Sequence, residues 1–368
     1  AGASANAIPI MKNLRDRIVK VSELIGEFHH TIKSGIVSDS NILSVNKETL
    51  EEIYEDFKWL IEESKYFDSL DTLAKKYYLL GNSEGYFNLF RLKRILCVYF
   101  YFEQWHEIQD PKSHVKNYKT IDLRYDSLIA ALLENKEGVI KFKEGVKFIS
   151  WNYDLQFEKT LIKYSNTNNF NSLKKEFFII PNKSTLNNND TALTYENVAS
   201  LIKLNGNAFL DQNLNEKDNT TTLYDIRSEF QNFGNLLEHL LSYYAKIFSS
   251  NNGFHESLKY FNYSWEVNEK EKYAYQTINR TIQEAKKSLS TAKTLIIIGY
   301  SFPYVNKEVD KEILSDCFPN KIIIQDLQPE IILRRLKSIL NYKINQRVTS
   351  KNIEVILEEV SNYFPTPD

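Results

Sequence analysis

Short apolar runs, each about the length of one strand, recur along this chain and constrain its fold more than any other feature. The clearest covers residues 294–298, a continuous β-branched run that ends at Gly299. A run that is apolar at every position is typical of a parallel strand buried on both faces. Similar runs occur at 146–150, 177–180, 200–204, 322–324 and 353–357. Because helical stretches separate several of them, we predict an α/β fold in which helices flank a parallel sheet.

Helical periodicity dominates residues 45–143 instead. In one predicted helix the apolar side chains recur at the spacing of a single face: Leu50, Ile53, Phe57, Leu60 and Ile61. Thr49 and Glu52 fit a capping box at the start of this helix. We therefore predict a largely α-helical insertion at 45–143, which divides the α/β core into residues 1–44 and 144–368.

Charge and cysteine content exclude several classes of protein. The 46 basic and 48 acidic residues give a net charge of −2, so no overall field favours nucleic acid, and we expect no direct nucleic-acid binding. Cys97 and Cys317, the only cysteines, are too few for a four-thiolate zinc site, and we expect no metal. The longest apolar run, 95–102, is too short to span a bilayer, so we expect a cytoplasmic protein without membrane contact.

The first residues resemble a loop that binds phosphate. Small residues at 1–7 precede Ile8 and Pro9, and a helical pattern follows from Met11. Such a loop normally follows a buried strand, which directs its backbone amides toward the phosphates. We therefore expect a short segment ending in a strand before residue 1. The alternative is a plain terminus of small residues.

Polar residues follow four of the predicted strands at the point where each strand ends. The groups are 150–154 (Ser-Trp-Asn-Tyr-Asp), 205–207 (Asn-Gly-Asn), 299–301 (Gly-Tyr-Ser) and 325–326 (Gln-Asp). Ligands of open α/β sheets bind beyond the carboxyl ends of the strands, so we expect these groups to line one crevice. Taken singly, each could instead be a helix cap or a turn residue, as Asn and Asp after a strand often are.

The order of these groups resembles the sirtuin superfamily. The matching motifs are Ala-Gly-Ala-Ser at 1–4 with Ala-Ile-Pro at 7–9, Asn-Tyr-Asp at 152–154, Lys-Leu-Asn-Gly at 203–206 and Gly-Tyr-Ser at 299–301. Asp326 is the candidate for the ribose contact that follows the next strand. The resemblance implies a Rossmann-like core that binds NAD as its substrate, and it does not cover the helical insertion.

The resemblance also implies a role for each matched residue. The loop residues that would hold the pyrophosphate of NAD are Ala1, Gly2, Ala3, Ser4 and Pro9. The residues that would bind the adenosine end are Gly299, Ser301 and Asp326. Asn152 would orient the ribose or an attacking water. Asp154 would supply negative potential or fix the nicotinamide amide, and Asn205 would occupy the third catalytic position.

Asn205 departs from the family pattern, because sirtuins carry their catalytic histidine at this position. An imidazole can accept a proton near neutral pH, whereas a carboxamide cannot. We therefore expect this chain to be slow or inactive as an enzyme. The asparagine is either natural or an engineered change, and the close match of the surrounding residues favours the second.

The chain lacks the four cysteines with which sirtuin deacylases build the zinc module that shapes their peptide groove. This absence argues against an acylated peptide as the substrate. Without that module the chain resembles bacterial antiphage effectors, whose sirtuin-like domain hydrolyses NAD to ADP-ribose and nicotinamide in abortive infection. By this resemblance we expect a homo-oligomer, or a separate sensor protein of the ATPase or Argonaute type. The alternatives are a non-catalytic module that binds NAD or ADP-ribose, and an interaction scaffold built on the aromatic stretch 99–105.

Overall fold

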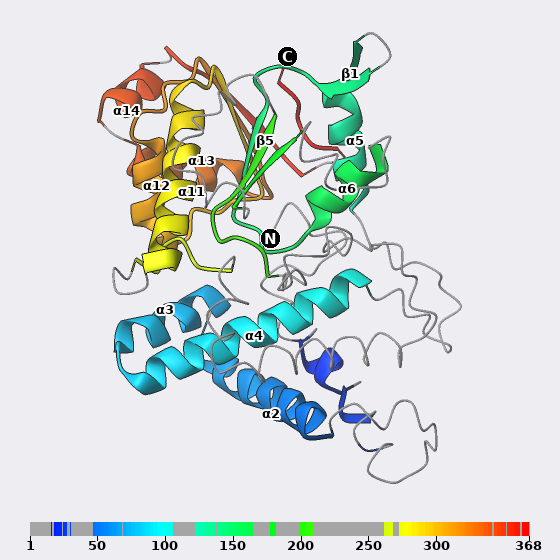
Figure 1. Cartoon of the computed structure of the whole chain (residues 1–368). Coiled ribbons are helices and arrows are strands. Elements are labelled where there is room, and N and C mark those ends of the chain that lie inside the picture. Colours follow the sequence, from blue (N-terminus) through cyan, green and yellow to red (C-terminus); the bar gives the residue numbers. More distant parts are fainter. Residues whose placement is uncertain are drawn as a thin grey trace. The chain divides into compact units, whose positions relative to one another are not determined.

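The computed structural model divides the chain into two compact units (Figure 1). It describes residues 47–67, 69–105, 122–136, 139–164, 177–181, 199–208, 261–267, 272–340, 342–350, 352–360 and 363–367, and parts of 16–30. One unit, the sheet unit, comprises Ala1–Ala5, Ile121–Asn207 and Asn262–Asp368. The other, the helical unit, comprises Asn6–Thr120 and Ala208–Phe261.

Two three-stranded sheets form the framework of the sheet unit, and both are entirely parallel. The first has the order β3 (Lys147–Ser150), β5 (Ser200–Lys203), β4 (Phe178–Ile180). The second has the order β6 (Thr294–Ile298), β7 (Lys321–Gln325), β8 (Glu354–Glu358). All six apolar runs that the sequence predicted as strands are confirmed.

Helices connect several of these strands, as is usual for parallel pairing. The helices of the sheet unit beside the two sheets are α6 (Gln156–Tyr164), α11 (Lys272–Ser290), α12 (Lys307–Leu314) after the 3₁₀ turn η5 (Tyr304–Asn306), α13 (Pro329–Ile339) and α14 (Tyr342–Thr349). α13 shows why they form: Pro329 starts it with a pre-set φ, and Ile332 and Leu336 bury one face against β7 and β8. The predicted α/β class, with parallel strands flanked by helices, is therefore observed, but the strands form two sheets where we had expected one.

The helical unit is built on α2 (Lys47–Glu63), α3 (Leu70–Leu80) and α4 (Ser83–Trp105), with the 3₁₀ turn η3 (Ser64–Tyr66) between the first two. The predicted apolar face of α2 is buried at Leu50, Ile53, Phe57 and Leu60. Beside this face the buried Asp56 pairs with Arg91 and Arg94 of α4. Tyr99 and Phe100, from the stretch considered as a scaffold surface, are buried in this unit. None of the helices that the structure describes combines the length and apolar character needed to cross a membrane.

The predicted capping box at Thr49 is wrong. α2 begins at Lys47, so Thr49 lies inside the first turn, where it is buried. Lys47 and Glu48 are good helix formers, and the helix therefore extends two residues further toward the N-terminus than the Thr-x-x-Glu pattern indicated.

Residues 121–143 group with the sheet unit in the structure, whereas we had assigned them to the helical insertion. α5 (Leu123–Leu132) packs against α6, and the hydroxyl of Tyr164 donates to the carbonyl of Asp126 across 3.1 Å. β1 (Leu133–Lys136) and β2 (Val139–Phe142) then form an antiparallel hairpin. The hairpin was not predicted, because its strands are short and mix charged with apolar residues.

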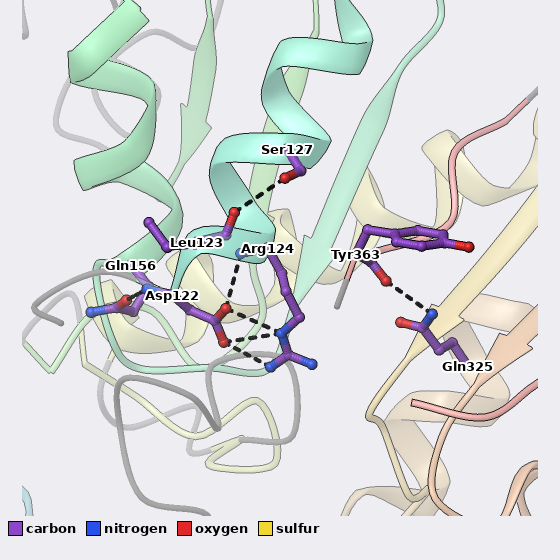
Figure 2. A network of polar contacts seen from close by, with 7 residues as sticks. All are labelled: Asp122, Leu123, Arg124, Ser127, Gln156, Gln325 and Tyr363. Carbon is purple, nitrogen blue, oxygen red and sulfur yellow. Dashed lines mark hydrogen bonds and ion pairs between the residues drawn. The ribbon is translucent and has the colours of Figure 1, made fainter. Parts of the chain in front are cut away.

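A buried ion pair between Asp122 and Arg124 lies at the start of α5, and Asp122 also contacts α6 (Figure 2). The Asp122 carboxylate accepts hydrogen bonds from the backbone N–H of Arg124 at 3.0 Å and from its Nη2 at 2.7 Å. The backbone N–H of Asp122 donates to Oε1 of Gln156, at the first position of α6, at 2.8 Å. Asp122 therefore caps α5, neutralises a buried guanidinium and positions the start of α6.

The C-terminal segment 363–367 links this corner to the second sheet. Gln325, the last residue of β7, donates from Nε2 to the carbonyl of Tyr363 at 3.1 Å (Figure 2). The ring of Phe364 lies 4.7 Å from the Arg124 guanidinium and 5.3 Å from the ring centroid of Tyr125. The segment thus contacts both α5 and β7.

Replacing Asp122 by alanine is expected to lower the free energy of unfolding by about 3–5 kcal/mol, because the buried Arg124 guanidinium loses its counter-charge. Urea denaturation followed by circular dichroism measures the change. Ser127→Ala, on the exposed side of the same helix, is the matched control and should change stability by less than about 0.5 kcal/mol. Equal effects of the two substitutions would contradict a special role for the ion pair.

Candidate functional site

Each parallel sheet ends with neighbouring strands in register. Ser150 at the end of β3 lies opposite Lys203 of β5, and Ile298 at the end of β6 lies opposite Gln325 of β7. The residues that follow these strands therefore leave each sheet side by side. We call 151–154, 204–207, 299–301 and 326 the carboxyl edge.

Two aromatic rings bring the two halves of the carboxyl edge together. Trp151 follows β3 and Tyr300 follows β6, and their rings stack with centroids 5.5 Å apart and planes 7° apart. Both rings are half-buried. The segments that follow β3 and β6 therefore meet in the sheet unit at this aromatic contact.

The three predicted catalytic residues lie on the β3–β5 half of this edge. Asn152 is half-buried, and its backbone N–H donates to Oγ of Ser150 at 3.1 Å. Asp154 is buried, and its Oδ1 accepts from the backbone N–H of Gln156 at 3.0 Å, so it caps α6 as the simpler interpretation anticipated. Asn205 is buried in the turn after β5.

The predicted adenosine-binding residues lie on the β6–β7 half. Gly299 has a φ of 57°, a left-handed conformation that favours glycine. Ser301 is exposed, and its carbonyl accepts from Nη1 of Arg335 at 2.7 Å. Oδ1 of Asp326 accepts from the backbone N–H of Gln328 at 3.0 Å, which is a turn contact ahead of α13. The predicted pyrophosphate residues lie outside the described residues: Ala1, Gly2, Ala3, Ser4 and Pro9.

A buried lysine, Lys203, contacts the backbone of Asp154. Nζ of Lys203 donates to the carboxylate of Glu158 at 2.9 Å and to the backbone carbonyl of Asp154. Burial raises the pKa of Glu158, and the charge of Lys203 opposes that rise. We had quoted Lys203 only as part of a motif; a lysine within an otherwise apolar strand is the sequence signal for such a buried pair.

The hydroxyl of Tyr300 is hydrogen-bonded to the carboxyl group of Asp310. It donates toward Oδ1 and Oδ2 of Asp310 at 3.0 and 2.9 Å, and it accepts from Nδ2 of Asn306 at 3.2 Å. Asp310 is only 1% exposed. Burial raises the pKa of Asp310 to about 8, and the hydrogen bond from Tyr300 opposes the rise. These contacts fix the ring that stacks on Trp151.

A turn from a distant part of the chain closes over Asn205, and the sequence did not reveal it. The backbone N–H of Ser264 donates to Oδ1 of Asn205 at 3.1 Å. Tyr263 contacts the ring of Tyr153 edge to face at 5.9 Å and stacks on Trp265 at 4.7 Å. The aromatic run around Ser264 was the available signal, but nothing in it indicates which strand it covers.

Three buried polar atoms near this edge lack a hydrogen-bond partner among the described residues: Asn207 Oδ1, Ser264 Oγ and Asn306 Oδ1. A buried polar atom is costly unless it is hydrogen-bonded, so these atoms lower the stability of the edge.

The chemistry of the edge is that of amides, hydroxyls, aromatic rings and the carboxylates of Asp154 and Asp326. Among the described residues the single histidine is His30, which belongs to the helical unit. No group of three His, Cys, Asp or Glu side chains in the described parts of the chain could hold a metal ion. Such an edge can bind a polar, planar ligand by hydrogen bonding and stacking.

Asp310 gives the stability of the protein a defined pH dependence. Its ordinary pKa is 3.8, so between about pH 4 and 8 the folded chain holds a proton that the unfolded chain has lost. The free energy of unfolding therefore falls as pH rises through this window, by up to about 1.4 kcal/mol per pH unit from this group.

Asp310→Asn should flatten that slope, as measured by urea denaturation at pH 5, 6.5 and 8. Glu308→Gln, at an exposed acidic residue two positions earlier on α12, is the control and should keep the parent slope. An unchanged slope in Asp310→Asn would show that the carboxyl group is ionised in the folded protein.

Comparisons with protein families, with curated proteins and with solved structures found no match to this chain. Its function therefore has to be inferred from the residues of the carboxyl edge themselves.

Proposed function

We propose that the sheet unit is a Rossmann-like, sirtuin-type core that binds NAD at the carboxyl edge. In its histidine form it would hydrolyse NAD to ADP-ribose and nicotinamide as an antiphage effector, acting as a homo-oligomer or with a sensor protein. The observation that carries the proposal is the stacking of Trp151 on Tyr300, which joins the carboxyl ends of the two parallel sheets. Ligands of open parallel sheets bind at such an edge.

The polar groups of the edge suit the chemistry of this cleavage. The bond between C1′ of the ribose and the nicotinamide nitrogen breaks, its electron pair leaves with nicotinamide, and a water oxygen bonds to C1′ and releases a proton. Positive charge develops on the ribose in between, and the buried carboxylate of Asp154 would stabilise it. Asn152, two residues away on the same loop, offers an amide that can orient a ribose hydroxyl or the water.

One observation favours a second function, a non-catalytic module that binds NAD or ADP-ribose. Oδ1 of Asn205 already has a hydrogen-bond donor in the backbone N–H of Ser264, so the turn accommodates a carboxamide well. A carboxamide does not titrate near neutral pH, so such a site binds without taking a proton. The two functions differ in the effect of a histidine at position 205.

Asn205→His is expected to release nicotinamide from NAD at least about 100-fold faster than the parent chain, because an imidazole can accept the ribose proton. Nicotinamide is measured by chromatography at high protein concentration, so that an assembly can form. Asn205→Gln, which keeps the carboxamide, is the matched control and should stay at the parent rate.

Calorimetric titration with NAD separates the remaining outcomes of that experiment. NAD binding without turnover in any variant would support the binding module. No binding at millimolar NAD, in the parent or the variants, would reject both functions and favour the scaffold interpretation.

Asp154→Asn in the Asn205→His background separates the electrostatic role of Asp154 from its capping role. Asparagine still accepts the hydrogen bond from Gln156, so the free energy of unfolding should change by less than about 1 kcal/mol. Nicotinamide release should fall by roughly 100-fold, because the negative charge is lost. A stable variant with undiminished turnover would leave Asp154 as a helix cap alone.

A further inference from the structure

Asn205 and Ser264 meet although 58 residues separate them in the chain. The hydrogen bond from the backbone N–H of Ser264 to Oδ1 of Asn205 measures 3.1 Å. Asn205 is 2% exposed and Ser264 is fully buried, so water does not compete for this bond. A buried bond between two segments fixes both of them.

The bond also fixes which way the carboxamide faces. A backbone N–H can only donate, so the atom of Asn205 that faces Ser264 must be the oxygen. Nδ2, with two donor protons, therefore lies on the other side of the carboxamide. If the bond were absent, a rotation of the carboxamide about its last side-chain bond would exchange donor and acceptor.

The turn that supplies the donor is itself held rigidly. The backbone N–H of Glu266 donates to the carbonyl of Tyr263 at 2.9 Å, and Oε1 of Glu266 accepts from the backbone N–H of Tyr263 at 2.8 Å. Trp265 stacks on Tyr263, which in turn contacts Tyr153 beside Asn152. The amide of Ser264 is thus held at a fixed place relative to the carboxyl edge.

We infer that the backbone amide of Ser264 is a positioning group, which orients the Asn205 carboxamide so that Nδ2 is presented as a donor to the ligand. The ligand group that such a donor recognises is an oxygen acceptor, such as a ribose hydroxyl or the nicotinamide carbonyl. Only this choice of ligand rests on the proposed function; the orientation of Asn205 does not.

Ser264 can be tested by substitution, because it occupies the second position of the turn Tyr263–Glu266. Proline is favoured there, and it has no N–H. Ser264→Pro therefore removes the donor, and its Cδ takes the place of the hydrogen, so the oxygen of Asn205 must also move away. Ser264→Ala keeps the N–H, removes only the hydroxyl, and is the matched control.

NAD affinity is measured by calorimetric titration of the whole chain in a double-mutant cycle. Ser264→Pro should weaken binding at least about 3-fold, because it removes the hydrogen bond and turns the carboxamide away, and Ser264→Ala should change it less than about 2-fold. In the Asn205→Ala background, Ser264→Pro should cause no further loss, because the group that it positions is gone. An additive loss in the double variant, or no loss in Ser264→Pro, would overturn the inference.

A second measurement needs no ligand and separates this inference from the proposed function. The side-chain amide signals of Asn205 are identified in nitrogen-correlated NMR spectra by their disappearance in Asn205→Ala. They should shift in Ser264→Pro and stay in place in Ser264→Ala. Unmoved signals in Ser264→Pro would overturn the inference, whereas a shift in a chain that fails to bind NAD would reject the proposed ligand alone.

Discussion

A lysine ammonium buried inside the first sheet is the constraint on which the candidate site depends. Lys203 cannot remain charged in an apolar interior without partners, and its Nζ finds them in Glu158 and in the carbonyl of Asp154. Those partners determine where α6 lies against β5 and where the loop after β3 turns. The position of Asp154 at the carboxyl edge is therefore a consequence of satisfying one buried charge. A substitution of Lys203 would disturb the site although Lys203 itself contacts no ligand.

Side-chain contacts join distant parts of the sheet unit at two places. At the carboxyl edge the stack of Trp151 on Tyr300 bridges the two sheets, and the buried Asp310 keeps the second ring in place. The C-terminal segment links β7, through Gln325, to α5, through the contact of Phe364 with Tyr125. These contacts join residues far apart in the sequence, a topology that is associated with slow folding.

The strands could be predicted and several key contacts could not, for physical reasons. Parallel strands are typically apolar along their length, so six short runs were enough to identify them, although β3, β6 and β8 are only partly buried in the structure. The hairpin at 133–142 mixes charged and apolar residues and has no such signature. Asp310 looks like a surface residue on an amphipathic helix until Tyr300 is placed over it. The contact of Ser264 with Asn205 uses a backbone N–H, which every residue except proline has, so the sequence gives no signal for it.

The Asn205–Ser264 hydrogen bond also joins the two ends of a long segment of the chain. Asn207 is the last residue of the sheet unit before segment 208–261 of the helical unit, and Asn262 is the first after it. Asn205 and Ser264 each lie two residues inside the sheet unit from these boundaries. The hydrogen bond between them therefore closes the sheet unit at the point where its sequence is interrupted.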